Sequence, residues 1–391
     1  MGSGLILAIR LLFVSGAFVL ALGTLSWTHS DSALAALVEF QNRTILISSL
    51  VSLGYSSIIL YYASRGRRQG VWSTLQMFNF TPIMTAFSIT IALVYDHNIS
   101  NMYNIAAVSF GTVLYTLATA MPSYYIGRGR LRYFAATEIL TTLGFALATI
   151  LAAALHSATP VVVIGLYVAM NAAKCVAYTV GDAQILTHLT TRWNGRPNFV
   201  LAKKFGLLSW ITGAATALIY RGLLFEVINL GQRVNRTDAL FYWSILDRAQ
   251  NVVQVINTLS FRHAAISKAN QRDMAKRSIA LYPPIGAACI ITLSAAVSVW
   301  YWLKGQHLEM AVFLLAPLFL IWGFRSVVQN LLLARRLFAP VISNAFLVLV
   351  VAGGGWLAIK SAQLSFASLV GLASVTLVLS SAHLVWSLRR V

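Results

Sequence analysis

Apolar residues recur along the chain in long runs, which are separated by short segments rich in glycine, proline, asparagine and basic residues. A run of about 20 apolar residues is long enough to cross a bilayer as an α-helix, and the separating residues are typical of turns. The pattern predicts about twelve transmembrane helices, over residues 5–27, 39–63, 76–95, 103–126, 134–156, 159–180, 205–230, 239–260, 279–303, 308–333, 338–359 and 365–388.

The composition favours a membrane protein. Hydrophobic residues make up 58% of the 391 residues and charged residues only 10%, whereas a soluble domain carries roughly 25% charged residues. The predicted helices leave few residues for a domain outside the membrane. We therefore expect an all-α polytopic membrane protein.

Basic residues outnumber acidic ones by 29 to 10. In a soluble protein this excess would suggest a nucleic-acid partner, but in a membrane protein it is first a question of which side carries the cations. The connections on one side contain only Arg233, Arg236, Lys304 and Lys360. Those on the other side, with the C-terminus, contain Arg65, Arg67, Arg68, Arg128, Arg130, Arg132, Arg192, Arg196, Lys203, Lys204, Arg262, Lys268, Arg272, Lys276, Arg277, Arg335, Arg336, Arg389 and Arg390. Basic loops stay in the cytoplasm, so both termini are predicted to be cytoplasmic, and no nucleic-acid partner is expected.

The longest cytoplasmic connection, residues 181–204, follows the sixth predicted helix. It contains the loop formers Asn194, Gly195 and Pro197. It divides the chain into two predicted six-helix lobes, residues 1–190 and 191–391. An even number of helices gives the two lobes the same orientation, as in parallel repeats.

Some charged residues lie inside the predicted helices, where a cation costs roughly 2.5–3.5 kcal/mol at the bilayer centre. The cations are Arg10, Arg43, Lys174, Arg221, Arg248 and Arg325, and the acids are Glu138, Glu226 and Asp247. Snorkelling to the head groups is an alternative for Arg10 and Arg43, which lie near helix ends. Local pairs of Glu226 with Arg221 and of Asp247 with Arg248 are another, but three acids cannot neutralise six cations.

Polar residues accompany these charges. Asp247, Asn251, Gln254 and Thr258 form one stripe on the eighth predicted helix, and Gln329 follows Arg325 by one turn on the tenth. Such a stripe is consistent with hydrogen bonds between helices or with a water-filled lumen. Because arginine holds phosphate groups well, cations from both lobes along a lumen indicate an anionic substrate.

No motif for enzymatic or cofactor chemistry is present. The seven histidines lack metal-ligand spacing, and the chain has no glycine-rich phosphate loop and no nucleophile elbow. Cys175 and Cys289 lie in apolar runs and are predicted to be core residues. We therefore expect no enzyme, no cofactor and no metal, and we expect transport that is driven by the substrate or by a coupling ion.

Two segments resemble a known family. "LVSLGYSSIILYYASRGRR" (Leu50–Arg68) resembles the end of the second helix of Wzx-type polysaccharide flippases of the MOP superfamily. "DALFYWSILDRAQNVVQVINTLSFRHAAISKA" (Asp238–Ala269) resembles their eighth helix. The chain departs from the family pattern at Ala264 and Ala265, where a proline is common, and at Arg221, where members often carry an acid late in the seventh helix.

The resemblance implies that an undecaprenyl-diphosphate-linked oligosaccharide is moved from the cytoplasmic to the periplasmic leaflet of a bacterial inner membrane. It implies alternating access of two lobes, and it makes polysaccharide polymerase and chain-length regulator proteins expected partners. The expected substrate contacts are Arg221, Arg248, Arg325, Lys174, Arg43, Arg10, Asn251, Gln254 and Gln329. Asp247, Glu226 and Glu138 are candidates for coupling a proton or a sodium ion.

Two other functions stay open. A MATE-like exporter of small molecules predicts a cavity dominated by acids, because its usual substrates are cations. A membrane-embedded polyprenyl-sugar transferase or polymerase predicts a sizeable loop with catalytic groups, and no predicted loop exceeds about 25 residues.

The cation distribution predicts which loops a membrane-impermeant reagent reaches. In a variant without the native cysteines, Thr191→Cys in intact cells should stay unlabelled by an impermeant maleimide, whereas Gln306→Cys should react. Labelling of Thr191→Cys alone would reverse the predicted orientation.

Overall fold

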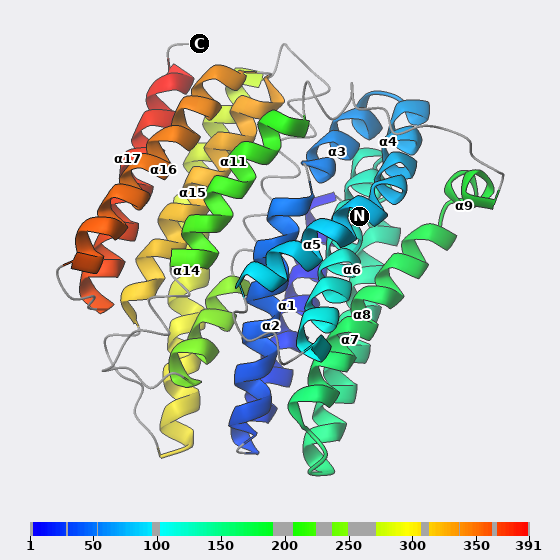
Figure 1. Ribbon diagram of the computed structural model, residues 1–391, viewed down its shortest axis with the longest axis vertical. Helices are drawn as coiled ribbons and strands as arrows, with labels where there is room; N and C mark the ends of the chain where they lie inside the picture. The colour runs from blue at the N-terminus through cyan, green and yellow to red at the C-terminus, as the bar shows by residue number, and fades with distance from the viewer. Residues whose placement is uncertain are drawn as a thin grey trace. The chain divides into compact units, whose positions relative to one another are not determined.

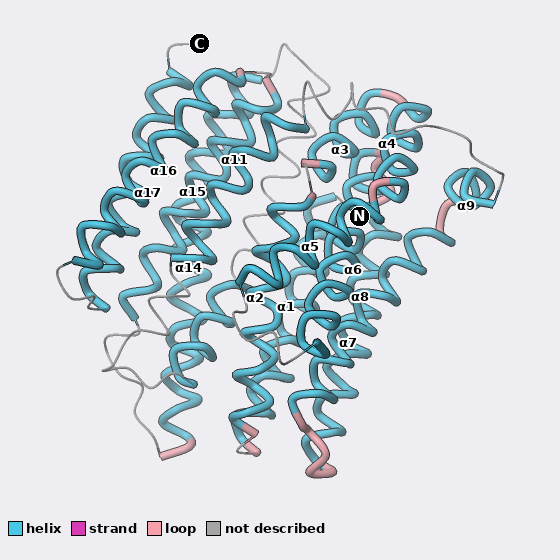
Figure 2. Tube along the Cα trace, viewed as in Figure 1, coloured by secondary structure: helices cyan, strands magenta, loops and turns pink. Residues whose placement is uncertain are grey.

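The computed structural model describes residues 3–28, 30–52, 54–95, 102–190, 206–223, 237–248, 271–305, 313–335, 337–361 and 366–389. Throughout these residues the regular structure is helical, without strands (Figure 2). The chain forms two compact units, Met1–Gly213 and Ala214–Val391, here called unit 1 and unit 2. The predicted lobe boundary at 190/191 adjoins residues 191–205, which lie outside the described residues.

Unit 1 consists of helices that pack against one another (Figure 1). They are α1 (Ser3–Trp27), α2 (Asp31–Val51), α3 (Tyr55–Arg65), α4 (Arg67–Asn79), α5 (Thr81–Tyr95), α6 (Met102–Gly127), α7 (Leu131–Ala154), α8 (Pro160–Val180) and α9 (Ala183–Thr190). The start of α8 is specified locally: the Thr159 hydroxyl accepts from the Val162 amide, and Pro160 occupies the first position. The packing of α1 on α7, and of α7 on α8, positions the charged groups described below.

Unit 2 contains the remaining long helices. They are α14 (Gln271–Leu303), α15 (Leu315–Ala334), α16 (Phe338–Ser361) and α17 (Phe366–Arg389). A shorter helix, α11 (Leu207–Ala217), crosses the boundary between the units and continues as a π-helix, η2 (Leu218–Leu223). Residues 237–248 are also helical. Within the unit, α17 packs against both α15 and α16.

Nine helices within the described residues are long and apolar enough to cross a membrane. Their surfaces are the reverse of those of a soluble protein: Leu12 is 73% exposed, while Arg325 is 1% exposed. An exposed apolar surface on such helices is matched to lipid rather than to water. The predicted class, an all-α polytopic membrane protein, is confirmed.

The second and third predicted helices are each broken in two. The backbone turns at Gly54, which has a φ of 69°, and a Cβ there would lie 2.6 Å from the carbonyl oxygen of Gly206. Glycine is therefore needed both for the left-handed conformation and for the close approach. The break between α4 and α5 precedes Pro82, which has no amide hydrogen and suits the first turn of a new helix. The helix α2 also begins at Asp31, earlier than predicted.

The seventh and eighth predicted helices are described only in part. The seventh corresponds to α11 and η2, and the eighth begins with the helical residues 237–248. The remainder of both predictions, 224–230 and 249–260, lies outside the described residues.

One close packing point within unit 1 explains why α3, α4 and α6 contain small residues. Ala63 of α3 lies between Gly70 of α4 and Gly127 of α6. A Cβ would lie 2.6 Å from the Ala63 Cα if built at Gly70, and 2.6 Å from the Ala63 Cβ if built at Gly127. Small residues at helix crossings let backbones approach closely in membranes.

We expect Gly127→Ala to destabilise unit 1, because the added methyl group overpacks Ala63, at a cost of about 1–3 kcal/mol. Thermal unfolding of the purified protein in detergent should show a lower midpoint. Gly144→Ala is the matched control, since a Cβ there meets no atom within 4 Å. Equal midpoints for the two variants would contradict this packing.

Candidate substrate-binding site

Three of the predicted charged residues meet in the interior of unit 1. Oε2 of Glu138 lies 3.3 Å from Nη2 of Arg10 and 3.0 Å from Nζ of Lys174. Oε1 of Glu138 accepts a hydrogen bond of 2.9 Å from the Tyr178 hydroxyl. None of the three charged side chains is more than 12% exposed. Two cations thus share one carboxylate, and one formal positive charge is left over.

Helical geometry brings this charged cluster together. Lys174 and Tyr178 are four residues apart, so both point from the same face of α8 toward Glu138 on α7. Arg10 comes from α1, and its guanidinium carbon lies 5.0 Å from the ring centroid of Phe134, one turn before Glu138. Arg10 is buried and paired, so it does not snorkel to the head groups. Its Nε is buried without a hydrogen-bond partner.

A second polar centre of unit 1, around Asp182, was not predicted. Oδ2 of Asp182 lies 2.8 Å from Nη1 of Arg130 and 3.4 Å from Nη1 of Arg128, and it accepts a hydrogen bond of 3.0 Å from the Tyr124 hydroxyl. Oδ1 accepts from the backbone amide of Gln184 at the start of α9. The hydropathy pattern places Asp182 in a loop. The available signal is an aspartate directly before a short helix, where it serves as an N-cap.

Tyrosines connect the two centres. The rings of Tyr178 and Tyr125 are 5.3 Å apart, and those of Tyr125 and Tyr124 are 5.4 Å apart. Tyr178 is hydrogen-bonded to Glu138 and Tyr124 to Asp182. A continuous chain of aromatic contacts therefore joins the buried charged cluster to the end of unit 1 that the sequence places in the cytoplasm.

In unit 2, Arg221 and Asp247 form an ion pair. Arg221 lies on the π-helix η2, and its guanidinium carbon is 6.0 Å from the Trp243 ring centroid. The two local pairs considered from the sequence were Glu226 with Arg221 and Asp247 with Arg248. The observed pair joins two separate helical segments, and Glu226 lies outside the described residues.

Arg325 occupies a different environment. Its Nε donates to the Ser380 hydroxyl and its Nη2 donates to Oδ1 of Asn344 at 3.0 Å. Asn344 in turn donates to the Ser380 carbonyl oxygen at 2.8 Å. These uncharged partners come from α16 and α17 and were not predicted, because isolated serine and asparagine residues give no sequence signal. Gln329, one turn after Arg325 on α15, is also buried.

The remaining candidate residues have the following positions. Arg43 is half-buried on α2, and Arg248 is half-buried at the end of the helical stretch 237–248. Asn251 and Gln254 lie outside the described residues. Within the described part of the chain, no group of three or more His, Cys, Asp or Glu side chains could hold a metal ion. Of the candidates, unit 1 brings together Arg10, Lys174 and Glu138, and unit 2 brings together Arg221 and Asp247.

Comparison by sequence gives no relative: no protein-family model matches the chain. No curated protein matches it either.

Comparison by structure does give similar proteins. An outward-facing multidrug resistance MATE family transporter of the MOP superfamily has a TM-score of 0.68 and 12% identity, over 99% of this chain and 95% of that one. A MOP superfamily transporter from Pyrococcus furiosus, for which reverse polarity of the binding pocket suggests a different function, has a TM-score of 0.63 and 12% identity, over 97% and 95%. The MATE multidrug transporter DinF-BH, solved as a complex, has a TM-score of 0.63 and 12% identity, over 98% and 95%.

The chain is a multi-pass helical membrane protein. Its fold is that of MATE transporters of the MOP superfamily. The three similar structures named above are transporters.

The carboxylate of Glu138, which Arg10 and Lys174 share, is predicted to stabilise the protein. Glu138→Gln leaves Arg10 and Lys174 buried without a counter-ion, and removal of one partner of a buried pair costs about 3–5 kcal/mol. The midpoint of thermal unfolding should fall clearly. Adding Lys174→Met to Glu138→Gln should recover part of the loss, because one unpaired charge is removed.

The control for this prediction is Asp31→Asn, which removes an exposed carboxylate at the start of α2. Its midpoint should match that of the unmodified protein. If Glu138→Gln unfolds at the same temperature as Asp31→Asn, the charged cluster does not stabilise unit 1.

Proposed function

We propose that this protein moves an undecaprenyl-diphosphate-linked oligosaccharide from the cytoplasmic to the periplasmic leaflet of a bacterial inner membrane. The observation that carries the proposal is the buried positive charge of unit 1, where Arg10 and Lys174 share a single carboxylate. Arg325 of unit 2, buried against the uncharged groups of Ser380 and Asn344, supports it.

The chemistry of such a substrate matches these groups. A diphosphate is a strong anion that arginine and lysine side chains bind through charge-assisted hydrogen bonds. Sugar hydroxyl groups need polar partners such as Gln329, Asn251 and Gln254, while the polyprenyl tail can remain in lipid. Arg10, Lys174 and Arg325 are the proposed diphosphate contacts, and Arg43, Arg221 and Arg248 are further candidates.

Glu138 adds a means of coupling. It is the internal counter-ion of Arg10 and Lys174, so a substrate phosphate must compete with it for both cations. A proton on Glu138 would remove that competition and strengthen anion binding, and by linkage the bound anion would equally strengthen proton binding. Asp247, paired with Arg221, and Glu226 are the other candidates for coupling to a proton or a sodium ion.

Export of a small molecule is the second candidate function. The likeness to MATE multidrug transporters supports it. The Pyrococcus furiosus transporter with a binding pocket of reverse polarity shares the same fold, so pocket charge is the property that separates candidate cargoes. Polysaccharide polymerase and chain-length regulator proteins would be partners only of the first function.

The test is export of surface polysaccharide in a host whose own copy is deleted. Lys174→Gln leaves Arg10 paired with Glu138, so the fold should persist while a phosphate contact is lost. We expect Lys174→Gln and Arg325→Gln each to reduce export roughly tenfold or more, the equivalent of one lost charged hydrogen bond. Lipid-linked oligosaccharide should accumulate on the cytoplasmic side.

Lys304→Gln, directly after the end of α14, is the control, since it removes a cation outside the proposed contacts. Immunoblots of membranes confirm equal protein levels. Normal export in both Lys174→Gln and Arg325→Gln would contradict the proposed function. Resistance to a toxic organic cation that depends on the protein, with no effect on polysaccharide, would favour the second function.

A further inference from the structure

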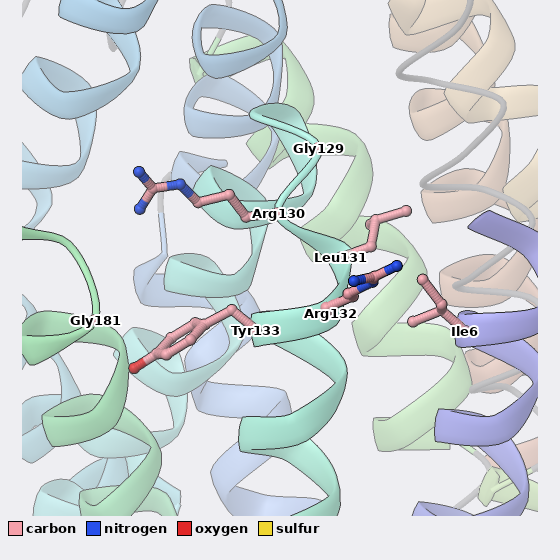
Figure 3. Close-up of a pocket in the computed structure, with 7 residues that line it drawn as sticks. All are labelled: Ile6, Gly129, Arg130, Leu131, Arg132, Tyr133 and Gly181. Atoms are coloured by element: carbon pink, nitrogen blue, oxygen red, sulfur yellow. The ribbon is translucent and has the colours of Figure 1, made fainter. Parts of the chain in front are cut away.

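A cavity of about 440 Å³ lies at the α6–α7 turn of unit 1, outside the buried charged cluster. Its lining includes the basic side chains of Arg130 and Arg132 and the apolar side chains of Ile6 and Leu131, with Arg132 on the side of Ile6 (Figure 3). None of the residues that line it is acidic. A cavity that is basic and apolar at once suits an amphiphilic anion.

The surface of α7 shows what surrounds this cavity. Arg132, Ala136, Leu140, Leu147 and Leu151 are all exposed and follow one another at helical spacing, so they form one stripe. The leucines of this stripe face lipid, because they are large, apolar and uncovered. Arg132 to Leu151 spans about 28 Å along the helix, close to the thickness of about 30 Å of the hydrocarbon core. Arg132 therefore lies at the level of the lipid head groups.

The two arginines have different roles. Arg130 is held by Asp182 at 2.8 Å, so it contributes positive potential but is already engaged. Arg132 is exposed and extends toward Ile6 at the start of α1, away from the direction of Arg130 (Figure 3). Its guanidinium is thus available at the apolar side of the cavity.

The backbone of the same turn adds donors. Gly129 has a φ of 74° and follows the end of α6, and α7 begins directly at Leu131. The first amides of a helix have no acceptor within the helix, no side chain caps this end, and no acid lies in its first turn. Leu131, Arg132 and Tyr133, which carry these amides, all line the cavity, so the amides and the Arg132 guanidinium favour a negative charge there.

We propose that this cavity binds the phosphate of an anionic membrane lipid of the leaflet that the sequence places in the cytoplasm. Arg132 and the first amides of α7 hold the phosphate, and the acyl chains run along Ile6 and the leucine stripe of α7. The site is independent of the transported cargo, since it faces the bilayer at the end of unit 1 and shares no residue with the Glu138 cluster.

The neighbouring helix α9 fits the same level of the membrane. Asp182, which holds Arg130, also caps α9, and α9 leaves Leu186 and Leu189 exposed. Exposed leucines on a short helix at the head-group level insert into the interface. The α6–α7 turn and α9 therefore form one lipid-facing edge.

The experiment uses the full-length protein in neutral detergent and native mass spectrometry. Dioleoylphosphatidylglycerol should be retained at one site in preference to dioleoylphosphatidylcholine. Arg132→Gln should weaken phosphatidylglycerol binding roughly tenfold, as expected for one charged hydrogen bond. Arg132→Lys should weaken it less, because the charge remains while the planar fork is lost.

Arg65→Gln is the matched control: it removes an exposed arginine at the end of α3, on the side that the sequence also places in the cytoplasm. It should leave phosphatidylglycerol binding unchanged. Equal losses for Arg132→Gln and Arg65→Gln would indicate diffuse attraction and overturn the site. Inorganic phosphate that displaces the lipid at comparable concentration would overturn the assignment to a lipid, as would equal retention of phosphatidylcholine.

A diazirine in the acyl chain of phosphatidylglycerol locates the bound molecule without any substitution. Cross-links should concentrate on peptides that contain Ile6 and Leu131. Cross-links spread evenly over the exposed leucines of other helices would also reject the proposed cavity.

Discussion

A charge buried among membrane helices needs a counter-ion or hydrogen-bond partners, and in unit 1 a single carboxylate serves two cations. Glu138 joins α1, α7 and α8 through Arg10, Lys174 and Tyr178. Without it, two cations would be left in a medium of low dielectric constant, where the penalty for an unpaired charge is large. The arrangement of the three helices and the electrostatic character of their interior therefore have the same origin.

Unit 2 accommodates its cations by other means. Arg221 has a full counter-ion in Asp247 and an aromatic ring beside it, so this pair adds no formal charge to its surroundings. Arg325 is buried against the hydroxyl of Ser380 and the amide of Asn344. These groups satisfy guanidinium donors while contributing no negative charge. The two units thus differ in how they hold positive charge, although both belong to one MATE-like fold.

The membrane-spanning helices could be predicted from the sequence because length and hydropathy are local properties. The breaks were harder. At Gly54 the backbone of Gly206, which is distant in the sequence, approaches closely. No local sequence pattern predicts this contact. The break before Pro82 did have a local signal, since proline suits the first turn of a helix, but the apolar run continues through it. Hydropathy alone therefore predicts one continuous helix where the backbone forms two.

The charged residues of the site were recognisable and their partners were not. An arginine or lysine within an apolar run is conspicuous because of its cost, so Arg10, Lys174 and Arg325 could be singled out. Which acid meets which cation depends on helix packing, because Arg10 and Glu138 are far apart in the chain, as are Arg221 and Asp247. Nothing in the sequence distinguishes Asn344 and Ser380 as partners of Arg325, because both contacts depend on how the helices pack.

The sharing of Glu138 also sets a limit on how tightly unit 1 could hold an anion. An anionic cargo would meet two cations that already interact with a carboxylate. Its binding free energy would therefore be the difference between the interaction of the cations with the anion and their interaction with Glu138. This internal counter-ion stabilises the unoccupied state, and it would compete with a bound anion for both cations. A fully neutralised cluster would bind no anion, and a cluster without Glu138 would be unstable when unoccupied. One carboxylate for two cations lies between these limits, which is the condition that release as well as binding requires.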